Sequence, residues 1–429
     1  MAVGAPGLDA RHAALLALDA VLEKDRSLDA AWREAKIDRL KERDAGFARL
    51  LVLTTLRRLG SIDAVIDRFV AKRPVGKNRL GEQIMRIAGA ELMALDGAPH
   101  AAVDTAVRLA KRLPETRRLS GMVNAVCRRL SHEGCQMFDA IDAEAVDTPA
   151  WLWERLKSAY GEPTARAIAA AHRHGARLDV MPAKDGQSWA ERLGGALTPA
   201  GTVRLDGGAV QALEGYDEGA WWVQDAAATL PARLLGDIKG KRVLDLCAAP
   251  GGKTMQLAAM GAEVTALDIS NPRMRRMREN LLRTRTSVKV VIADALDWQP
   301  EGDFDAILLD APCSATGTIR RHPDLPHLKS GAVLSALTPL QDALMGKAWD
   351  WLAPGGAMVY VTCSLLPEEG ENRIAAFLAT HPEARLDPIA PGQGIDPEMI
   401  SEGALRTLPC HWPDIGGLDG FYAARLIRA

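Results

Sequence analysis

One short stretch of this chain combines residue types that could bind a reactive small molecule. Residues 243–254 read Val-Leu-Asp-Leu-Cys-Ala-Ala-Pro-Gly-Gly-Lys-Thr. Gly251 and Gly252 let a ligand approach the backbone without a Cβ in the way, and the unpaired N–H groups of a following helix favour polar or anionic ligand groups. The stretch therefore predicts a nucleotide-type site between a strand and a helix.

Two common nucleotide sites fit this turn poorly. A phosphate-binding P-loop needs a glycine where this chain has Cys247, and Pro250 removes an N–H donor that a phosphate would use. The three spaced glycines of a dinucleotide site are absent, although Asp268 ends the next apolar run about where a ribose-binding acid belongs. A nucleoside without a pyrophosphate remains, and S-adenosylmethionine fits that description.

The elements that must position this turn alternate between strands and helices. Helices are predicted over 272–283 and 339–352, and strands over 242–246, 263–267, 288–292, 306–309, 357–362 and 420–427. Such alternation predicts a mostly parallel sheet with helices on both faces. Four acids fall at or just past strand ends, which is the ligand edge of such a sheet: Asp245, Asp268, Asp294 and Asp310.

Three motifs, in this order, resemble those of the RsmB/Sun/Nop family of RNA (cytosine-5)-methyltransferases. They are Cys247 to Lys253, Asp310 to Gly317 (Asp-Ala-Pro-Cys-Ser-Ala-Thr-Gly) and Tyr360 to Ser364 (Tyr-Val-Thr-Cys-Ser). The resemblance covers nearly the whole chain and is strongest to the bacterial RsmB (Fmu/Sun) type, which methylates small-subunit ribosomal RNA. It implies an α/β fold, a Rossmann-like methyltransferase domain with a mostly parallel seven-stranded sheet, preceded by an all-α NusB-like bundle and a small α/β module.

The resemblance implies different roles for two cysteines. Cys363 would be the nucleophile that adds to C6 of cytosine, and Cys313 would assist release of the methylated product. A thiolate at C6 makes C5 able to attack the methyl donor, which divides one difficult step into two. DNA cytosine-5 methyltransferases place their nucleophile in a Pro-Cys motif, which would point to Cys313 instead. The presence of both motifs favours the RNA family and Cys363.

The resemblance also implies the surroundings of the two thiols. Asp310 would hydrogen-bond the N3/N4 edge of the cytosine, and Lys253 would contact the flipped base or support the thiolate. Asp268 would bind the ribose hydroxyls of S-adenosylmethionine, and Asp294 its adenine amino group. The expected cofactor-binding residues are Cys247, Ala248, Ala249, Pro250, Gly251, Gly252, Lys253, Asp268, Asp294 and Asp310.

A basic segment follows the first cysteine. Arg320, Arg321 and His322 resemble the family's Ile-Arg-Arg-His-Pro segment and would hold RNA phosphates near a flipped base. His322 has no cysteine or histidine at a spacing suited to zinc, so no metal is expected.

Charge is divided unevenly along the chain. Residues 1–135 contain 24 Lys and Arg against 17 Asp and Glu, a net charge of +7, whereas the remainder carries −9. Leucines at helical spacing (Leu15, Leu18, Leu22, then Leu50, Leu53, Leu56) predict a bundle of five to seven helices that resembles NusB-like RNA-binding domains. Paired basic residues on it could contact successive phosphates, or could be ordinary exposed helix charges. They include Arg57, Arg58, Lys72, Arg73, Lys77, Arg79, Lys111, Arg112, Arg117, Arg118, Arg128 and Arg129.

The resulting domain prediction has three parts: a NusB-like domain over 1–140, a small RNA-contacting module over 141–222 and a methyltransferase domain over 223–429. Many relatives carry Leu-Arg-Val-Asn in the small module, where this chain has Leu-Asp-Val-Met. Asp179 would repel a phosphate that an arginine would attract. We expect Trp221 and Trp222 to pack at the domain joint and not to stack on a base.

Composition indicates a globular, multidomain protein. Of its 429 residues, 48% are hydrophobic and 25% charged, and neither a run of about 18 apolar residues nor a leader within residues 1–11 is evident. The six cysteines include no Cys-x-x-Cys pair and are expected to be reduced. A cytoplasmic monomer acting on RNA is the expectation, and the resemblance implies 16S rRNA as the substrate. The alternatives are a tRNA or DNA cytosine methyltransferase and a non-catalytic RNA-binding or ribosome assembly factor.

Overall fold

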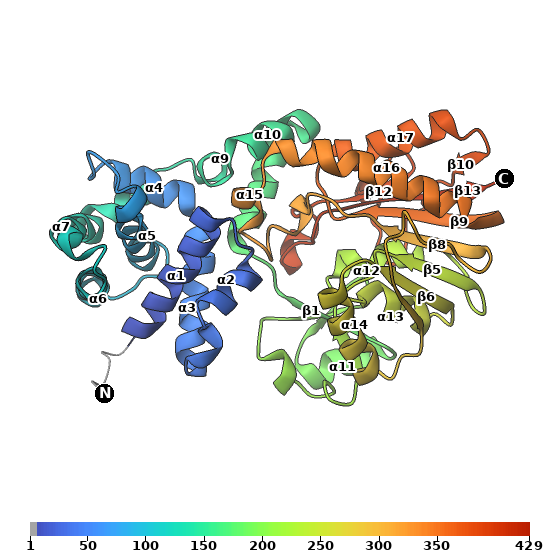
Figure 1. Ribbon diagram of the computed structural model, residues 1–429, viewed down its shortest axis with the longest axis horizontal. Helices are drawn as coiled ribbons and strands as arrows, with labels where there is room; N and C mark the ends of the chain where they lie inside the picture. The colour runs from blue at the N-terminus through green and yellow to red at the C-terminus, as the bar shows by residue number, and fades with distance from the viewer. Residues whose placement is uncertain (1–6) are drawn as a thin grey trace. The chain divides into compact units, whose positions relative to one another are not determined.

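The computed structural model describes residues 7–429 and contains two compact units (Figure 1). Unit 1 comprises residues up to 174 together with 321–330, and unit 2 comprises 175–320 and 331–429. The first six residues, part of the stretch inspected for a leader, lie outside the described residues. No helix in the described part of the chain is long and apolar enough to cross a membrane.

Unit 1 is helical. Its helices are α1 (Leu8–Lys24), α2 (Leu28–Glu34), α3 (Glu42–Arg57), α4 (Leu59–Asp67), α5 (Arg79–Met93), α6 (Pro99–Arg112), α7 (Ser120–Arg129), α8 (Cys135–Asp139), α9 (Ala143–Asp147), α10 (Ala150–His174) and α15 (Leu325–Leu328). One apolar core joins α1 to α7, with Leu15 and Leu18 fully buried. The predicted helical bundle is therefore present.

The buried face of α3 differs from the predicted one. Leu50 is 46% exposed, whereas Leu51 is fully buried. The buried positions follow the spacing of three and four that places residues on one side of a helix. They are Ala45, Ala48, Leu51, Val52, Thr55 and Leu56.

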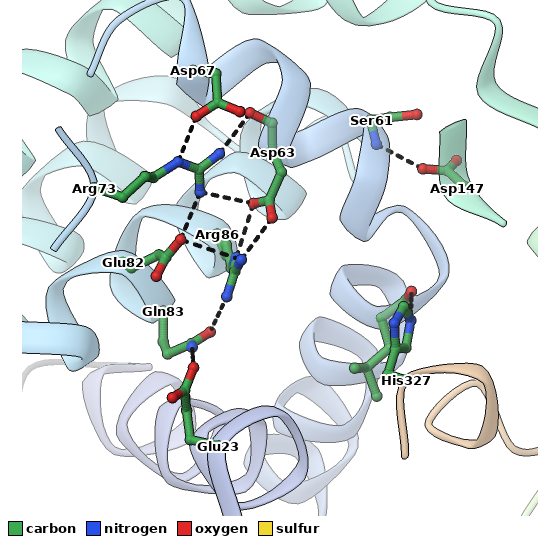
Figure 2. A network of polar contacts seen from close by, with 11 residues as sticks. Glu23, Ser61, Asp63, Asp67, Arg73, Glu82, Gln83, Arg86, Asp147 and His327 are labelled. Carbon is green, nitrogen blue, oxygen red and sulfur yellow. Dashed lines mark hydrogen bonds and ion pairs between the residues drawn. The ribbon is translucent and has the colours of Figure 1, made fainter. Parts of the chain in front are cut away.

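Residues 141–174 belong with unit 1, which differs from the predicted boundary at residue 140. The carboxylate of Asp147, at the end of α9, accepts a hydrogen bond of 2.7 Å from the backbone N–H of Ser61 in α4 (Figure 2). A Cβ on Gly60 would lie 1.9 Å from the carbonyl oxygen of Val146, so the glycine permits this close approach. These contacts are long-range in sequence, which explains why local composition did not predict them.

The segment 321–330 interrupts the sequence of unit 2, and hydrogen bonds hold it in unit 1. Asp324 accepts from the backbone N–H of Leu28 at 2.9 Å, and the indole of Trp151 donates to the carbonyl of Pro326 at 3.1 Å. The imidazole of His327 lies 3.1 Å from the carbonyl oxygen of Leu56 (Figure 2).

Unit 2 contains a small antiparallel sheet in the order β2-β3-β1-β4. Its strands are β1 (Leu178–Pro182), β2 (Ala196–Leu197), β3 (Val203–Leu205) and β4 (Trp221–Val223), with α11 (Gly186–Leu193) between β1 and β2. Trp221 and Trp222 in β4 are fully or almost fully buried, as expected for packing residues.

The large sheet of unit 2 has the order β11-β12-β13-β9-β8-β5-β6-β7, and β10 pairs with β13. Its strands are β5 (Arg242–Leu246), β6 (Glu263–Asp268), β7 (Lys289–Ile292), β8 (Phe304–Asp310), β9 (Leu352–Thr362), β10 (Ala384–Leu386), β11 (Ile400–Ser401), β12 (Ala404–Thr407) and β13 (Phe421–Arg428). Strands β5 to β9 pair in parallel and β13 runs antiparallel to β9. The short hairpin β11–β12 extends the predicted seven-stranded sheet.

Helices cover both faces of the large sheet. Alternate residues of a strand point to opposite faces, so one strand contributes to the core on each side. In β8, Ile307 and Leu309 join a core with residues of α16 and α17, whereas Ala306 and Leu308 join a core with residues of α12 and α13 (Figure 1). The helices of this domain are α12 (Ala226–Arg233), α13 (Gly252–Ala259), α14 (Asn271–Arg283), α16 (Leu334–Asp350) and α17 (Glu371–Thr380). Helix α16 begins five residues before the predicted start at Pro339, which lies inside the helix.

Candidate active site

The predicted cofactor loop connects β5 to α13. Gly251 precedes the helix with φ of 102°, in the region that favours glycine, and a Cβ there would lie 2.8 Å from Cγ of Met277. The loop is fixed to the end of β6 by two hydrogen bonds, because Ala248 N–H donates to the carbonyl of Leu267 at 3.1 Å and Ala249 N–H donates to Asp268 at 3.1 Å. The loop therefore has one defined shape beside the start of a helix.

Two further acids lie at the same edge. Asp268 ends β6 and is almost fully buried, and its second oxygen accepts from Ser270 N–H at 2.8 Å. Asp294 follows β7, is half-buried and accepts from Leu296 N–H at 2.9 Å. Each carboxylate oxygen can accept more than one hydrogen bond, so both acids retain acceptor capacity for a ligand. The small-residue loop and these acids at adjacent parallel strand ends fit a nucleoside such as the adenosine of S-adenosylmethionine.

Asp245 lies at the predicted strand end, as the last residue but one of β5, but its side chain is buried and not open to a ligand. It lies within β5, is fully buried and accepts a hydrogen bond from the hydroxyl of Thr254. Burial raises the pKa of Asp245 to about 7, and the hydrogen bond from Thr254 only partly opposes this shift. Asp245 is an interior acid beneath the cofactor loop.

A lysine and a carboxylate form an ion pair next to the loop. Nζ of Lys253 donates to Oδ2 of Asp310 at 2.8 Å, and their side chains are 10% and 29% exposed. Burial lowers the pKa of Lys253, but the charge and hydrogen bond of Asp310, together with Cys363, outweigh burial and raise it overall. Lys253 is therefore an ammonium, positioned by the first turn of α13.

The two motif cysteines meet at this edge. Cys313 follows β8 and Cys363 follows β9, and these strands are parallel neighbours. Their sulfurs lie 3.4 Å apart and both residues are partly exposed. Gly317 fixes the Cys313 loop against its neighbour, because its N–H donates to the carbonyl of Cys363 at 2.9 Å and a Cβ there would lie 1.8 Å from the carbonyl oxygen of Gly420.

The surroundings of Cys313 favour its thiol form. The hydrogen bond with Cys363 and then burial raise the pKa of Cys313 well above its ordinary value. Cys313 therefore retains its proton at neutral pH, and its S–H can donate to the sulfur of Cys363.

Sequence reasoning missed the groups beneath the two cysteine loops. Glu369, in a short turn after β9, is fully buried and hydrogen-bonds to Ser314 and Ser364, the residues that follow the two cysteines. In the sequence it stands in the acidic run Glu-Glu-Gly-Glu, which is typical of a solvated loop. The available signal was the position of the run, which only Leu-Leu-Pro separates from Thr-Cys-Ser.

The predicted RNA-binding residues after Cys313 are separated by the structure. Arg320 is 1% exposed and its Nε lies 3.7 Å from Oδ1 of Asp419, so its guanidinium is a buried structural cation and the predicted phosphate contact by this residue is not supported. Arg321 is half-buried and His322 is exposed. Arg320 belongs to unit 2, whereas the other two belong to unit 1.

Asp179 does not face RNA either. Its side chain is fully buried in β1 and forms a two-bond ion pair with Arg204, both at 2.7 Å. It also accepts from the N–H of Ala226 at the start of α12, at 3.0 Å. The departure from the family pattern therefore supplies an internal ion pair, and the predicted repulsion of a phosphate at this position is wrong.

Basic residues of unit 1 include an internal network and a set that lines a cavity. Arg73 is held by Asp63, Asp67 and Glu82 in an internal network that also contains Arg86 (Figure 2). Other basic residues line a cavity of about 650 Å³ at the ends of α5, α6 and α7. The residues lining it are Lys77, Arg79, Leu80, Pro114, Glu115, Arg117 and Arg118.

Comparison with known proteins finds two families along the chain. The family described as 16S rRNA methyltransferase RsmB/F matches residues 232–427, and the NusB family matches residues 8–132. The ribosomal RNA small subunit methyltransferase B of Yersinia enterocolitica is 33% identical, and the match covers 97% of this chain and 98% of that protein. The protein of the same name from Cronobacter sakazakii is 32% identical, with coverage of 98% and 99%.

Solved structures share the fold. The crystal structure of PH0851 has a TM-score of 0.78 at 23% identity and covers 99% of each chain. The structure of NSun6 from Pyrococcus horikoshii, solved with SFG, has a TM-score of 0.51 at 21% identity and covers 65% of this chain and 98% of its own. The predicted Rossmann-like methyltransferase fold is confirmed. With a full-length relative at 33% identity, this chain belongs to the RsmB/F family of S-adenosylmethionine-dependent RNA methyltransferases.

Proposed function

We propose that this chain methylates C5 of a cytosine in 16S rRNA, with Cys363 as the nucleophile and Cys313 as the residue that assists product release. The observation that carries the proposal is the 3.4 Å separation of the two sulfurs at the sheet edge that also holds Lys253 and Asp310. The family description and the names of the relatives support ribosomal RNA as the substrate.

The chemistry requires a nucleophile because cytosine C5 is too electron-poor to attack a methyl sulfonium directly. The Cys363 thiolate adds to C6, and the resulting enamine forms the new bond from C5 to the methyl group. The donor leaves as a neutral thioether when its bond to the methyl group breaks. The C5 proton then passes to water, and the electron pair of the C5–H bond forms the C5–C6 double bond as the bond between C6 and sulfur breaks, which restores the aromatic ring and the thiolate. S-adenosylmethionine, when bound, supplies the electrophilic methyl group.

The electrostatics of the site support this division of roles. The Lys253 ammonium lies near the nucleophile, since Cys363 is one of the groups that raise the pKa of Lys253. The protonated Cys313 donates a hydrogen bond to the Cys363 sulfur as it departs from C6, which stabilises the leaving thiolate. Asp310 is partly exposed beside Lys253 and hydrogen-bonds the N3/N4 edge of the cytosine.

The loop 247–253 would hold the cofactor, with Asp268 accepting from its ribose hydroxyls and Asp294 from its adenine amino group. Their remaining acceptor capacity at neighbouring strand ends supports these assignments.

RNA binding is assigned to the basic cavity of unit 1 and to Arg321 and His322. The cavity gathers Lys77, Arg117 and Arg118 on one surface. Arg320 is left out of this assignment because it is buried. We further propose that the enzyme acts as a monomer in the cytoplasm.

Two experiments test the proposal. Cys363→Ala should lower methyl transfer at least about 1,000-fold because the covalent route is lost, while calorimetry shows unchanged S-adenosylmethionine binding. Cys135→Ala, which removes an exposed thiol of unit 1, is the matched control and should leave the rate unchanged. Normal turnover by Cys363→Ala would contradict the nucleophile assignment.

Bisulfite sequencing of RNA from cells with and without the gene tests the substrate. Cells without the gene should lack one methylated cytosine in 16S rRNA, and the loss of a methylated cytosine in tRNA instead would contradict the proposed substrate.

A further inference from the structure

A buried carboxylate links the two cysteine loops from below. Glu369 is fully buried, and its two oxygens accept four hydrogen bonds from three residues. Oε1 accepts from the backbone N–H of Ser314 at 2.8 Å and from the amide of Gln341 at 3.1 Å. Oε2 accepts from the hydroxyls of Ser314 at 2.5 Å and Ser364 at 2.6 Å.

The direction of these hydrogen bonds is fixed by their neighbours. Ser364 Oγ accepts from the N–H of Leu366 at 3.0 Å, so its single hydrogen is available to Glu369. The backbone N–H of Ser314 and the amide nitrogen of Gln341 can only donate. These three donors therefore present hydrogens to the side chain, and the Ser314 hydroxyl can supply the fourth, which is the arrangement that a carboxylate requires.

Glu369 is itself held against the sheet. Its carbonyl oxygen accepts from the hydroxyl of Tyr360 at 2.9 Å and from the hydroxyl of Thr362 at 3.3 Å, both in β9. Gln341 also donates to the carbonyl of Pro312 at 2.9 Å, which ties the start of the Cys313 loop to the same cluster. The carboxylate thus connects β9, α16 and both loops.

We propose that Glu369 is a positioning residue for the two thiols: it holds the serine after each cysteine so that the two sulfurs stay in contact, and it places a buried negative charge directly beneath the Cys313 loop. This inference rests on the proposed roles of Cys313 and Cys363. Its electrostatic part is supported by the charge of Glu369, which, after the hydrogen bond with Cys363 and burial, contributes to raising the pKa of Cys313. A thiol at position 313 can donate to the departing Cys363 sulfur, whereas a thiolate would repel it.

Glu369→Gln tests both the positioning of the two loops and the electrostatic effect on Cys313. An amide has one acceptor oxygen and one donor nitrogen, so two of the four donors would face an NH₂ group and a loop would lose its anchor. We expect kcat to fall about 10- to 100-fold, the range for a broken buried hydrogen-bond network, with S-adenosylmethionine binding and the KM for RNA unchanged. Loss of the charge should also increase alkylation of Cys313 by iodoacetamide at pH 8, because each unit by which the pKa of Cys313 falls gives about tenfold more thiolate. Mass spectrometry measures this alkylation relative to that of Cys135.

Three variants separate charge from geometry. Glu369→Asp keeps the charge, so it should lower kcat while Cys313 alkylation stays slow. Ser364→Ala removes one anchor and keeps the carboxylate, so it too should lower kcat without raising the ratio of Cys313 to Cys363 alkylation. Glu368→Gln, an equal charge change one residue earlier, should keep kcat within about twofold of the wild-type value, because the kcat loss is assigned to the hydrogen bonds of Glu369. Thermal unfolding and cofactor binding check that each variant is folded.

The outcomes distinguish this inference from the proposal on which it rests. If Cys363→Ala is inactive but Glu369→Gln has wild-type kcat and wild-type Cys313 alkylation, the positioning role is wrong and the nucleophile assignment stands. If Glu369→Gln and Glu369→Asp accelerate Cys313 alkylation equally, the effect is loop loosening and the electrostatic part is wrong. If Cys363→Ala is active, the proposed function fails first.

Discussion

The sheet edge of unit 2 and the basic surface of unit 1 use charged and polar residues in different ways. At the sheet edge, residues that follow three neighbouring strands converge, so that Lys253 contacts Asp310 and Cys313 contacts Cys363. In unit 1, much of the positive charge is used internally, as in the network of Arg73 and Arg86 with Asp63 and Glu82 (Figure 2).

The difference has a simple physical origin. Parallel strands end at one edge, so a residue just after any of them is placed near the others by the backbone alone. A helix surface imposes no such convergence, and a basic residue pairs with whichever acid packs beside it. Position is therefore informative at the sheet edge, whereas net charge is a weak guide in the helical unit.

The largest expected effect is at the sheet edge. Lys253→Met should lower methyl transfer about 100- to 10,000-fold, because the thiolate and Asp310 lose their cation. RNA affinity should be unchanged in a filter-binding assay, since RNA binding is assigned elsewhere. Lys289→Met, which removes a lysine paired with Glu301 at the surface, is the control. A comparable loss of activity in both variants would show that general charge, and not the converged site, is what matters.

A second prediction concerns the interior beneath that edge. The folded-state pKa of Asp245, about 7, lies above its unfolded value, so the unfolded chain binds fewer protons between about pH 4 and pH 7. The contribution of Asp245 to stability is therefore present at low pH and is lost as pH rises to about 7. At about 1.4 kcal/mol per pKa unit, the free energy of unfolding loses up to about 4 kcal/mol over this range.

The isosteric variant Asp245→Asn tests this prediction, because it cannot ionise. Its melting temperature relative to wild type should rise between pH 5 and pH 7 and then level off, as followed by circular dichroism. A difference that does not change with pH would mean that Asp245 titrates normally and that the edge is more solvated than its burial indicates.

The smallest effect is expected in unit 1. Lys77→Ala, Arg117→Ala and Arg118→Ala combined should weaken RNA binding about tenfold and reduce the slope of log affinity against log salt by about 2, since each phosphate contact on single-stranded RNA contributes about 0.7. The rate at saturating RNA should be unchanged.

A matched triple variant sharpens this test. Lys36→Ala, Arg39→Ala and Lys41→Ala combined remove three exposed positive charges from the same unit, outside the cavity. Equal losses of affinity and slope in the two triple variants would mean that the cavity has no special role.

The difference between the sheet edge and the helical unit also explains what could be predicted from the sequence. The strand–turn–helix around Gly251 and the cysteines after β8 and β9 follow from local patterns, and the structure brings Cys313, Cys363, Lys253 and Asp310 to one edge. Periodicity alone predicted the helical bundle and six strands of the large sheet. The short strands β10 to β12 have too few residues to show a periodic pattern.

What could not be predicted depends on distant partners. Arg320 and Arg321 are neighbours in the sequence, yet only Arg320 is fully buried, because it lies beside Asp419. Asp179 was predicted to repel an RNA phosphate, and it pairs instead with Arg204 on the adjacent strand. Glu369 lies in an acidic run, and only its long-range contact with Ser314 reveals that it is interior.

The most direct test of the central claim is to trap the covalent intermediate. Cys313→Ala, incubated with substrate RNA and S-adenosylmethionine, should accumulate a protein–RNA adduct that survives a denaturing gel, because release is impaired after Cys363 has attacked. Mass spectrometry of the digested adduct should place the nucleotide on Cys363, and Cys313→Ala combined with Cys363→Ala should give none. An adduct on any other residue, or an adduct that persists in the double variant, would contradict the account.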